Sequence, residues 1–143
     1  TRIGVTGVQT CALPICVYEC VDESTGWLQK GSDLDGESSF GYAGTSVSLS
    51  SDGQEIAIGA RNNDNNGGSN SGHVRVYKWD TTSSAGGGGQ WAQKGFGIDG
   101  EARDEQSGFS VSLSSDGNVV AVGVPKNEGG TCNHGLVRIF DWN

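Results

Sequence analysis

Three oxygen-bearing side chains at alternate positions have the types and spacing of a metal-binding loop. Asn62, Asp64 and Asn66 precede Gly67, which matches ligand positions 1, 3 and 5 and the turn glycine of a calcium loop. The segment supplies only one carboxylate and has no distal glutamate. Because Asn, Asp and Gly also dominate ordinary turns, a hydrophilic loop accounts for the same residues. The sequence therefore indicates a candidate calcium site at Asn62, Asp64 and Asn66 and predicts no other cofactor.

Acidic side chains form a second group that could do chemistry. They cluster ahead of two similar stretches of sequence, at Asp35, Glu37, Asp99, Glu101, Asp104 and Glu105. Such carboxylates can bind cations, basic proteins or sugar hydroxyls, and a solvated surface that keeps the chain soluble explains them as well. The two histidines, His73 and His134, have no matching partners, and we expect both to be exposed. No Ser/His/Asp or Cys/His arrangement emerges, so the chain is predicted not to be an enzyme.

Composition narrows the class of protein. Of 143 residues, 25 are Gly and only 2 are Pro, and the glycines follow no three-residue period, which excludes a collagen. The formal net charge of −8 argues against nucleic acid or an anionic membrane as a partner. No apolar run approaches the ~18 residues that a membrane span needs.

Residues 5–15 do not read as natural protein sequence. They spell VTGVQTCALPI, which matches the translation of a common sequencing adapter over its whole length. We therefore predict that residues 1–15 are adapter-derived, that the natural amino terminus is missing and that Cys11 is not a natural cysteine. Cys16 and Cys20 lie about 13 Å apart if their segment is a strand, which is too far for a disulfide bond.

A tandem repeat organises the rest of the chain. Residues 27–60 align with 91–124 at an offset of 64, with 18 identities in 34 positions. The run SVSLSSDG at 46–53 recurs unchanged at 110–117, and residues 72–79 match 135–142 at an offset of 63. A period of this size is typical of a propeller, a solenoid or an array.

Each repeat contains four strand-like runs and no helical periodicity. In the first repeat the expected strands are 46–50, 55–60, 73–79 and about 90–98. Asp52-Gly53 predicts a two-residue type I′ turn between the first two strands. Ser48, Ser50, Ala57 and Gly59 place small side chains where the blades of a propeller would crowd. The predicted fold is all-β, with about two four-stranded antiparallel blades of an incomplete β-propeller, and a plain antiparallel sandwich is the alternative.

This reading divides the chain into four segments. After the adapter-derived residues 1–15, residues 16–37 form the last strands of a preceding blade. Residues 38–98 form a complete blade, and residues 99–143 form a second blade without its fourth strand. Because four to eight blades close a propeller, further blades of the same chain are expected partners.

The repeat also resembles a known family. Phe40-Gly41, followed by Ile-Gly-Ala-Arg at 58–61, has counterparts in Gly108-Phe109-Ser110 and Val-Gly-Val-Pro at 122–125. These motifs resemble the FG-GAP repeat of integrin-α-type β-propellers over residues 16–143. The resemblance implies an extracellular or cell-surface module, not an enzyme, that mediates adhesion or binds a protein or glycan ligand, often with calcium. The calcium run that the family carries between its first two strands is absent from this sequence.

Two other interpretations fit parts of the sequence. SLSSDGQEIAIGA followed by VRVYKWD resembles the WD repeat, which implies an intracellular interaction scaffold, but that repeat has a period of about 40–45 residues. Alternatively, these blades are the scaffold of a propeller enzyme whose active site lies in other blades. Arg75 and Arg138 recur inside the third strands, and we expect them to form structural salt bridges to a recurring Asp or Glu, with an anion-binding site as the alternative. The aromatic residues of the third strands are expected to pack in the core between blades: Tyr77, Trp79, Phe140 and Trp142.

Overall fold

The protein is built from antiparallel β-strands. The computed structural model describes residues 14–82, 88–127 and 134–142, and these residues contain three sheets and no helix. None of the sheets closes on itself. The all-β class predicted from the sequence is therefore confirmed.

The central sheet contains the first repeat. Its strands are β3 (Ala43–Leu49), β4 (Glu55–Ala60), β5 (His73–Asp80) and β6 (Gln90–Gln93), in the order β3-β4-β5-β6, and β7 (Ile98–Asp99) also pairs with β5. The first three strands match the expected ranges closely. The fourth was predicted as one strand over 90–98 and is instead interrupted between β6 and β7. Gly95, with a φ of +70°, turns the chain at this interruption.

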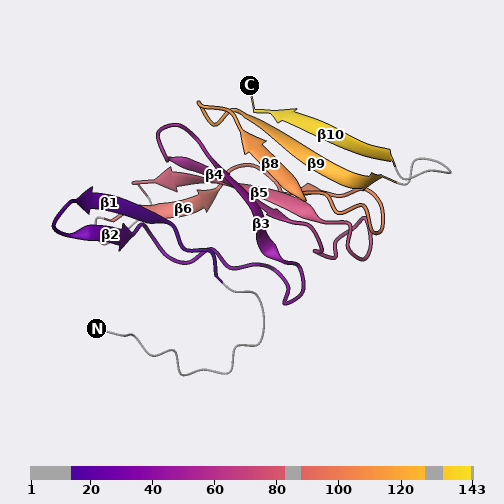
Figure 1. Cartoon of the computed structure of the whole chain (residues 1–143), viewed down its shortest axis with the longest axis horizontal. Coiled ribbons are helices and arrows are strands. Elements are labelled where there is room, and N and C mark those ends of the chain that lie inside the picture. The colour runs from indigo at the N-terminus through magenta and orange to yellow at the C-terminus, as the bar shows by residue number, and fades with distance from the viewer. Residues whose placement is uncertain (1–13, 83–87, 128–133, 143) are drawn as a thin grey trace.

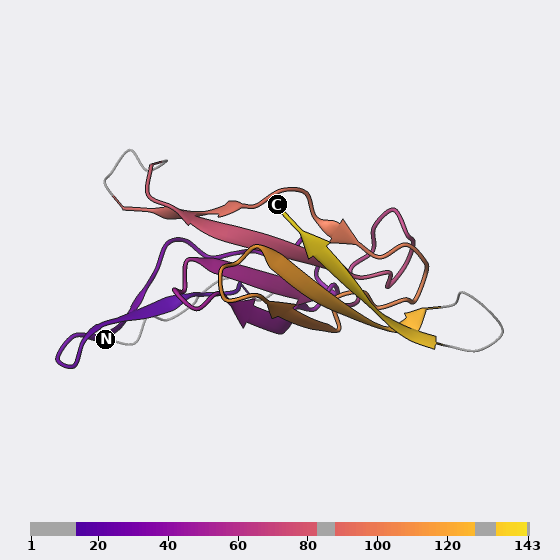
Figure 2. The same cartoon turned by 90° about the horizontal axis from the view of Figure 1, so that it is seen from above.

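Two smaller sheets flank the central one (Figure 1). β8 (Ser110–Leu113), β9 (Val119–Asn127) and β10 (His134–Asp141) form the carboxy-terminal sheet, in the order β10-β9-β8. β1 (Tyr18–Asp22) and β2 (Gly26–Gln29) form an amino-terminal hairpin. Seen from above, the carboxy-terminal sheet crosses the central sheet with its strands twisted relative to it (Figure 2).

The hairpin repeats the outer half of the central sheet. The matching pairs are Tyr18–Gln29 and Cys20–Trp27 in the hairpin, and Tyr77–Gln93 and Trp79–Trp91 in the central sheet. The backbone N–H of Lys30 donates to Val17 O at 2.8 Å, and that of Lys94 donates to Val76 O at 2.7 Å. β1 and β2 therefore occupy the positions of β5 and β6 in their own unit.

Two apolar layers cover both faces of the central sheet. The layer shared with the carboxy-terminal sheet contains Ala57, Val74, Val76, Leu113, Val120, Val122 and Val124. The layer on the opposite face contains Leu34, Ile56, Ile58 and Trp91, with Ile15 and Val17 packed against it. Because alternate residues of a strand face opposite sides, β4 feeds both layers and is buried along its whole length. Tyr77, Trp79, Phe140 and Trp142 pack partly buried against these layers, as expected.

Small residues bring the central and carboxy-terminal sheets into close contact. A methyl group on Gly59 would overlap the carbonyl oxygen of Gly108, so only glycine fits there. Ser46 Oγ donates to the same carbonyl at 2.8 Å, and Ser48 Oγ accepts from the Leu113 N–H at 2.9 Å. The expectation that small side chains lie at a crowded contact is confirmed.

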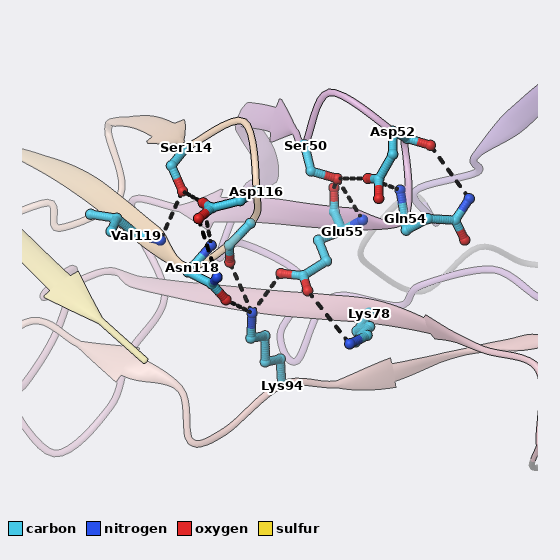
Figure 3. Close-up of polar contacts among 11 residues, drawn as sticks. Ser50, Asp52, Gln54, Glu55, Lys78, Lys94, Ser114, Asp116, Asn118 and Val119 are labelled. Carbon is cyan, nitrogen blue, oxygen red and sulfur yellow. Dashed lines mark hydrogen bonds and ion pairs between the residues drawn. The ribbon is translucent and has the colours of Figure 1, made fainter. Parts of the chain in front are cut away.

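The repeated SSDG turns differ from the predicted type I′ geometry. Of the two central residues, only Gly53 has a positive φ, at +64°. Ser50 Oγ donates to Asp52 Oδ1 at 2.6 Å, and the Gln54 N–H donates to the same oxygen at 3.0 Å (Figure 3). These bonds, with that from Ser50 first, hold the pKa of Asp52 below its ordinary value. Asp52 thus lacks the positive φ that a type I′ turn requires, and the connection between β3 and β4 is longer than two residues.

The contact at Gly59 predicts a specific loss of stability. Replacing Gly59 by Ala should lower the free energy of unfolding by about 2 kcal/mol, because the carbonyl of Gly108 and its strand must move away. Urea unfolding measures this change. Gly88→Ala is the matched control, because a Cβ there meets nothing within 4 Å, and it should leave stability within about 0.5 kcal/mol. Equal effects of the two substitutions would contradict the close contact.

Candidate ligand-binding loops

Two loops lie side by side at one end of the sheets. One is the 61–72 loop between β4 and β5, and the other is the 100–107 segment between β7 and β8. Their backbones are joined by hydrogen bonds from Gly100 N to Gly72 O (2.8 Å), Asp104 N to Ser69 O (2.8 Å), Gln106 N to Asn70 O (3.1 Å) and Ser107 N to Ser71 O (2.9 Å). These hydrogen bonds place the two loops on one face of the protein.

The three candidate calcium ligands lie along the first loop with different partners. Asp64 is exposed, and its Oδ1 accepts from the backbone N–H of Asn70 at 2.8 Å. Asn62 Oδ1 accepts from Gln106 Nε2 at 3.5 Å, and Asn66 is exposed. Within the described ranges, no group of three or more His, Cys, Asp or Glu residues could hold a metal ion. The calcium site remains a prediction.

The residues between these candidates carry the loop's structure, which the sequence pattern did not reveal. Asn65 Nδ2 donates to Gly72 O at 2.7 Å, and its Oδ1 accepts from Ser71 Oγ at 2.5 Å and from the Gly67 N–H at 2.8 Å. Asn63 is only 2% exposed. The candidate metal ligands lie at positions 62, 64 and 66, whereas the asparagines that hold the loop together lie at the intervening positions 63 and 65.

A carboxylate anchors the first loop to the sheet. Glu37 forms an ion pair with Arg75, and its Oε2 accepts from Asn63 Nδ2 at 3.2 Å. His73 Nδ1 lies 2.9 Å from Asn63 Nδ2 and 3.3 Å from the same carboxylate oxygen. The predicted salt bridge of Arg75 to a recurring acid is confirmed.

The environment of His73 corrects a sequence-based expectation. His73 is buried, whereas His134 is exposed as predicted. The cause is its position in β5, where it pairs with Ala60 of β4 on one side and with Asp99 of β7 on the other. Burial lowers the pKa of His73, and the charge of Asp99 opposes this only in part.

The second repeat builds its own carboxylate centre. Arg138 Nη2 lies 2.7 Å from Glu105 Oε1 and 3.0 Å from Glu101 Oε2, which confirms the second predicted salt bridge. Glu105 also accepts from Asn127 Nδ2 at 2.7 Å and from the N–H groups of Glu101 and Ala102 at 2.6 and 3.0 Å. Burial alone would raise the pKa of Glu105, but these bonds and Arg138 outweigh it and hold the pKa below its ordinary value.

Glu105 therefore does not belong to an acidic surface, as the sequence had suggested. Its exposed fraction is 0%, while the Glu101 side chain on the same arginine is 76% exposed. The repeat could not reveal this role, because the residue that aligns with Glu105 in the first repeat is Gly41.

An aromatic and cationic patch borders the two loops. The Arg61 guanidinium lies 5.7 Å from the Tyr42 ring centroid and 5.5 Å from that of Phe109. Tyr42 and Phe109 are 56% and 44% exposed. Exposed rings beside a cation can contact the apolar face of a sugar or the side chains of a protein partner.

Comparison with known proteins does not assign the chain to a family. No protein-family model matches the sequence, and no curated protein is significantly similar to it. The described segments include no helix with the length and apolar character to cross a bilayer. Cys16 and Cys20 are free thiols, so the prediction that no disulfide bond joins them is confirmed. Cys11, Cys132 and residues 1–13 of the predicted adapter segment lie outside the described residues, while Ile15 pairs with Leu34.

The two acidic partners of Arg138 should contribute unequally to stability. Glu105→Gln removes a buried charge and leaves a guanidinium without its main partner, so the free energy of unfolding should fall by about 3 kcal/mol. Glu101→Gln removes an exposed partner of the same guanidinium and should cost less than about 1 kcal/mol. Chemical unfolding of the two variants tests this order, and a larger loss for Glu101→Gln would refute it.

Burial of His73 predicts a pH dependence of stability. The unfolded chain has the ordinary His pKa of 6.5 and the folded chain a lower one, so the unfolded state takes up the proton first as pH falls. Stability should be full above pH 6.5 and decline below it, by up to about 1.4 kcal/mol per pH unit. Unfolding measured between neutral and mildly acidic pH should show this slope in the wild type and in His134→Gln, but not in His73→Gln. Loss of the slope in His134→Gln instead would disprove the assignment.

Proposed function

We propose that this chain is part of an FG-GAP-like β-propeller that acts as a binding or adhesion module at the cell surface or outside the cell. The observation that carries the proposal is a contact that recurs once per unit. Lys30 Nζ lies 5.0 Å from the Trp79 ring and 3.5 Å from Gly53 O. Lys94 Nζ lies 5.1 Å from the Trp142 ring and 2.9 Å from Gly117 O.

The recurrence matters because it relates successive sheets in the same way. Each lysine follows the outer strand of one unit and reaches the first hairpin turn and the third-strand tryptophan of the next. Lys94 Nζ also lies 2.7 Å from Glu55 Oε2, so the same lysine contacts the first residue of β4 in the central sheet (Figure 3). A sheet-to-sheet contact that recurs in this way, with small residues at the inner strands, supports the proposal that the sheets are successive blades of a propeller.

The proposed ligand surface is the pair of joined loops with the adjoining aromatic patch. Asp64 and Asn66 offer exposed hydrogen-bonding groups in the same loop as Arg61, whose guanidinium lies over the rings of Tyr42 and Phe109. The loops are cross-linked before any ligand binds, so little conformational entropy is lost on binding. A protein or glycan ligand suits this mixture of polar groups and aromatic faces.

We propose a binding role and not a catalytic one because the titratable side chains near the loops are engaged in ion pairs and hydrogen bonds that hold the loops in place. Glu105 and Arg138 are engaged with each other and with backbone or amide groups. His73 is buried against Asn63 and Glu37. These side chains act in the proposed module by fixing loop geometry.

Ligand binding should depend on the patch and not on the turns at the other end of β4. The labelled protein is screened on glycan arrays and on cell surfaces, and Arg61→Ala should weaken any binding found by at least about tenfold. Gln54→Ala, in the 50–55 turn, is the control and should bind like the wild type. Equal binding by all three proteins would place the ligand elsewhere.

Calcium is tested separately with the same preparation. If the 62–66 segment holds calcium, millimolar calcium should raise the Tm of the wild type and not that of Asp64→Asn. An unchanged Tm in the wild type ends the calcium hypothesis and leaves the ligand-binding proposal standing.

A further inference from the structure

Arg61 lacks an acidic partner in the part of the chain that the structure describes. The other arginines described there, Arg75, Arg103 and Arg138, each form an ion pair with a carboxylate. The Nε atom of Arg61 is buried and has no hydrogen-bond partner among these residues. A buried donor without a partner costs free energy, so bonds within the described segments do not account for the position of this guanidinium.

Two aromatic rings, and not an acid, hold the guanidinium of Arg61. The rings of Tyr42 and Phe109 lie 5.7 and 5.5 Å from it and come from the segments just before β3 and β8. A ring attracts a cation through its face but does not accept the paired hydrogen bonds that a carboxylate accepts. The charge is therefore fixed in place, while the described residues leave its capacity to bind an anion unused.

Tyr42 has a backbone conformation that is unusual for an aromatic residue. Its φ is +52°, in the left-handed region that favours glycine. The N–H and the hydroxyl of Thr45 both donate to the Tyr42 carbonyl, at 3.0 and 2.6 Å, and hold this turn. Backbone strain of this kind is concentrated at binding and catalytic sites, so the turn is a second observation that points to a ligand at Tyr42 and Arg61.

The arginine of the patch does not recur with the repeat. Arg75 and Arg138, which hold the loops to the sheets, occur at matching positions in both repeats. Arg61 instead aligns with Pro125. Because neighbouring units of a repeat protein are joined by the same contacts, a group that only joined them would recur. We therefore expect Arg61 to serve a purpose particular to its own unit.

We propose that Arg61 binds the carboxylate of an acidic sugar, a pyranose residue that carries one carboxylate. This assignment rests on the proposed function, since it names the ligand class of the same loops and patch. An arginine donates two parallel hydrogen bonds to the two oxygens of one carboxylate. Tyr42, which is 56% exposed, offers a ring to the apolar face of the pyranose, and Asn66 in the 61–72 loop offers an exposed amide to its hydroxyls.

The surroundings of Arg61 favour an acidic sugar over an acidic peptide. Backbone groups of the two loops bond to each other, as from Gly100 N to Gly72 O and from Ser107 N to Ser71 O, so these groups are not offered to a peptide main chain. The formal net charge of −8 repels ligands with many carboxylates. A sugar chain with one carboxylate meets neither obstacle, because its hydroxyls bind side chains and water.

A matched pair of trisaccharides tests the proposal. One ends in glucuronic acid and the other in glucose, so that they differ only in the carboxylate group. Each is titrated into the full chain and followed by isothermal titration calorimetry. The acidic trisaccharide should bind at least about tenfold more tightly, because a hydrogen bond to a charged group commonly contributes that much affinity.

Substitutions of Arg61 separate charge from geometry. Arg61→Gln should remove the preference for the acidic trisaccharide. Arg61→Lys keeps the charge but not the planar pair of donors, so it should retain only part of the preference, and it gives a second variant if Arg61→Gln does not fold. Lys78→Gln is the control, because it removes a positive charge from the far end of β5, at a side chain that is 63% exposed, and it should bind like the wild type.

Equal binding of the two trisaccharides by the wild type, or no binding of either, would overturn the proposal. The same holds if Lys78→Gln lowers the preference as much as Arg61→Gln, because overall charge then explains it. Competition by a capped Gly-Glu-Gly peptide as strong as that by the acidic trisaccharide would show that the ligand is an acidic peptide instead. If Arg61→Ala weakens binding in the array and cell-surface screen while the two trisaccharides bind equally, the proposed function stands and only the acidic sugar is refuted.

Discussion

The spacing between the central and carboxy-terminal sheets depends on the contact of Gly59 with the backbone of Gly108, where no side chain lies between the two. The Gly108 carbonyl occupies the volume that any side chain at Gly59 would need, and Ser46 Oγ satisfies that carbonyl by a hydrogen bond. This contact brings β8 close to β3 and β4. Only at such a separation can Val74 and Val76 share one apolar layer with Val120 and Val122. The rest of the structure follows from this approach, because β4 is buried only when both of its faces are covered.

Charged groups then fix the ends of the sheets. At one end Lys94 links Glu55 to the turn of the next sheet, and at the other Arg75 and Arg138 bind carboxylates from the loops that precede each repeat. A buried ion pair adds little net stability by itself, because desolvation offsets most of the attraction. Its effect here is geometric, since each pair selects one position for a loop. The exposed groups of the loops are therefore presented in a defined arrangement.

Sequence reasoning succeeded where the signal is local and failed where burial decides. The strands at 55–60 and 73–79 could be predicted from alternation and β-branched residues, and the arginine pairs from their recurrence. The exposure of His73 and the surface role of Glu105 were predicted wrongly, because neither residue reveals from its neighbours in sequence that other strands or loops will cover it. The type I′ turn was also wrong, since the side chains of Ser50 and Asp52 stabilise a different backbone conformation. The predicted calcium ligands lie in a loop whose hydrogen bonds are organised by Asn63 and Asn65.

The sequence by itself determined the all-β class, the positions of most strands and the repeat, because alternation and recurrence are properties of the chain read along its length. It also indicated the small residues of the inner strands and the recurring acid–base pairs. Only the tertiary structure decided which carboxylate is buried, which histidine is enclosed and which tryptophan is covered. Those outcomes depend on contacts between segments about 60 residues apart, such as Trp91 with Lys30. Identical or aligned residues thus acquire different environments: Trp27 is exposed, whereas Trp91 is buried because it packs with Leu34 and Trp79 and donates to Lys30 O.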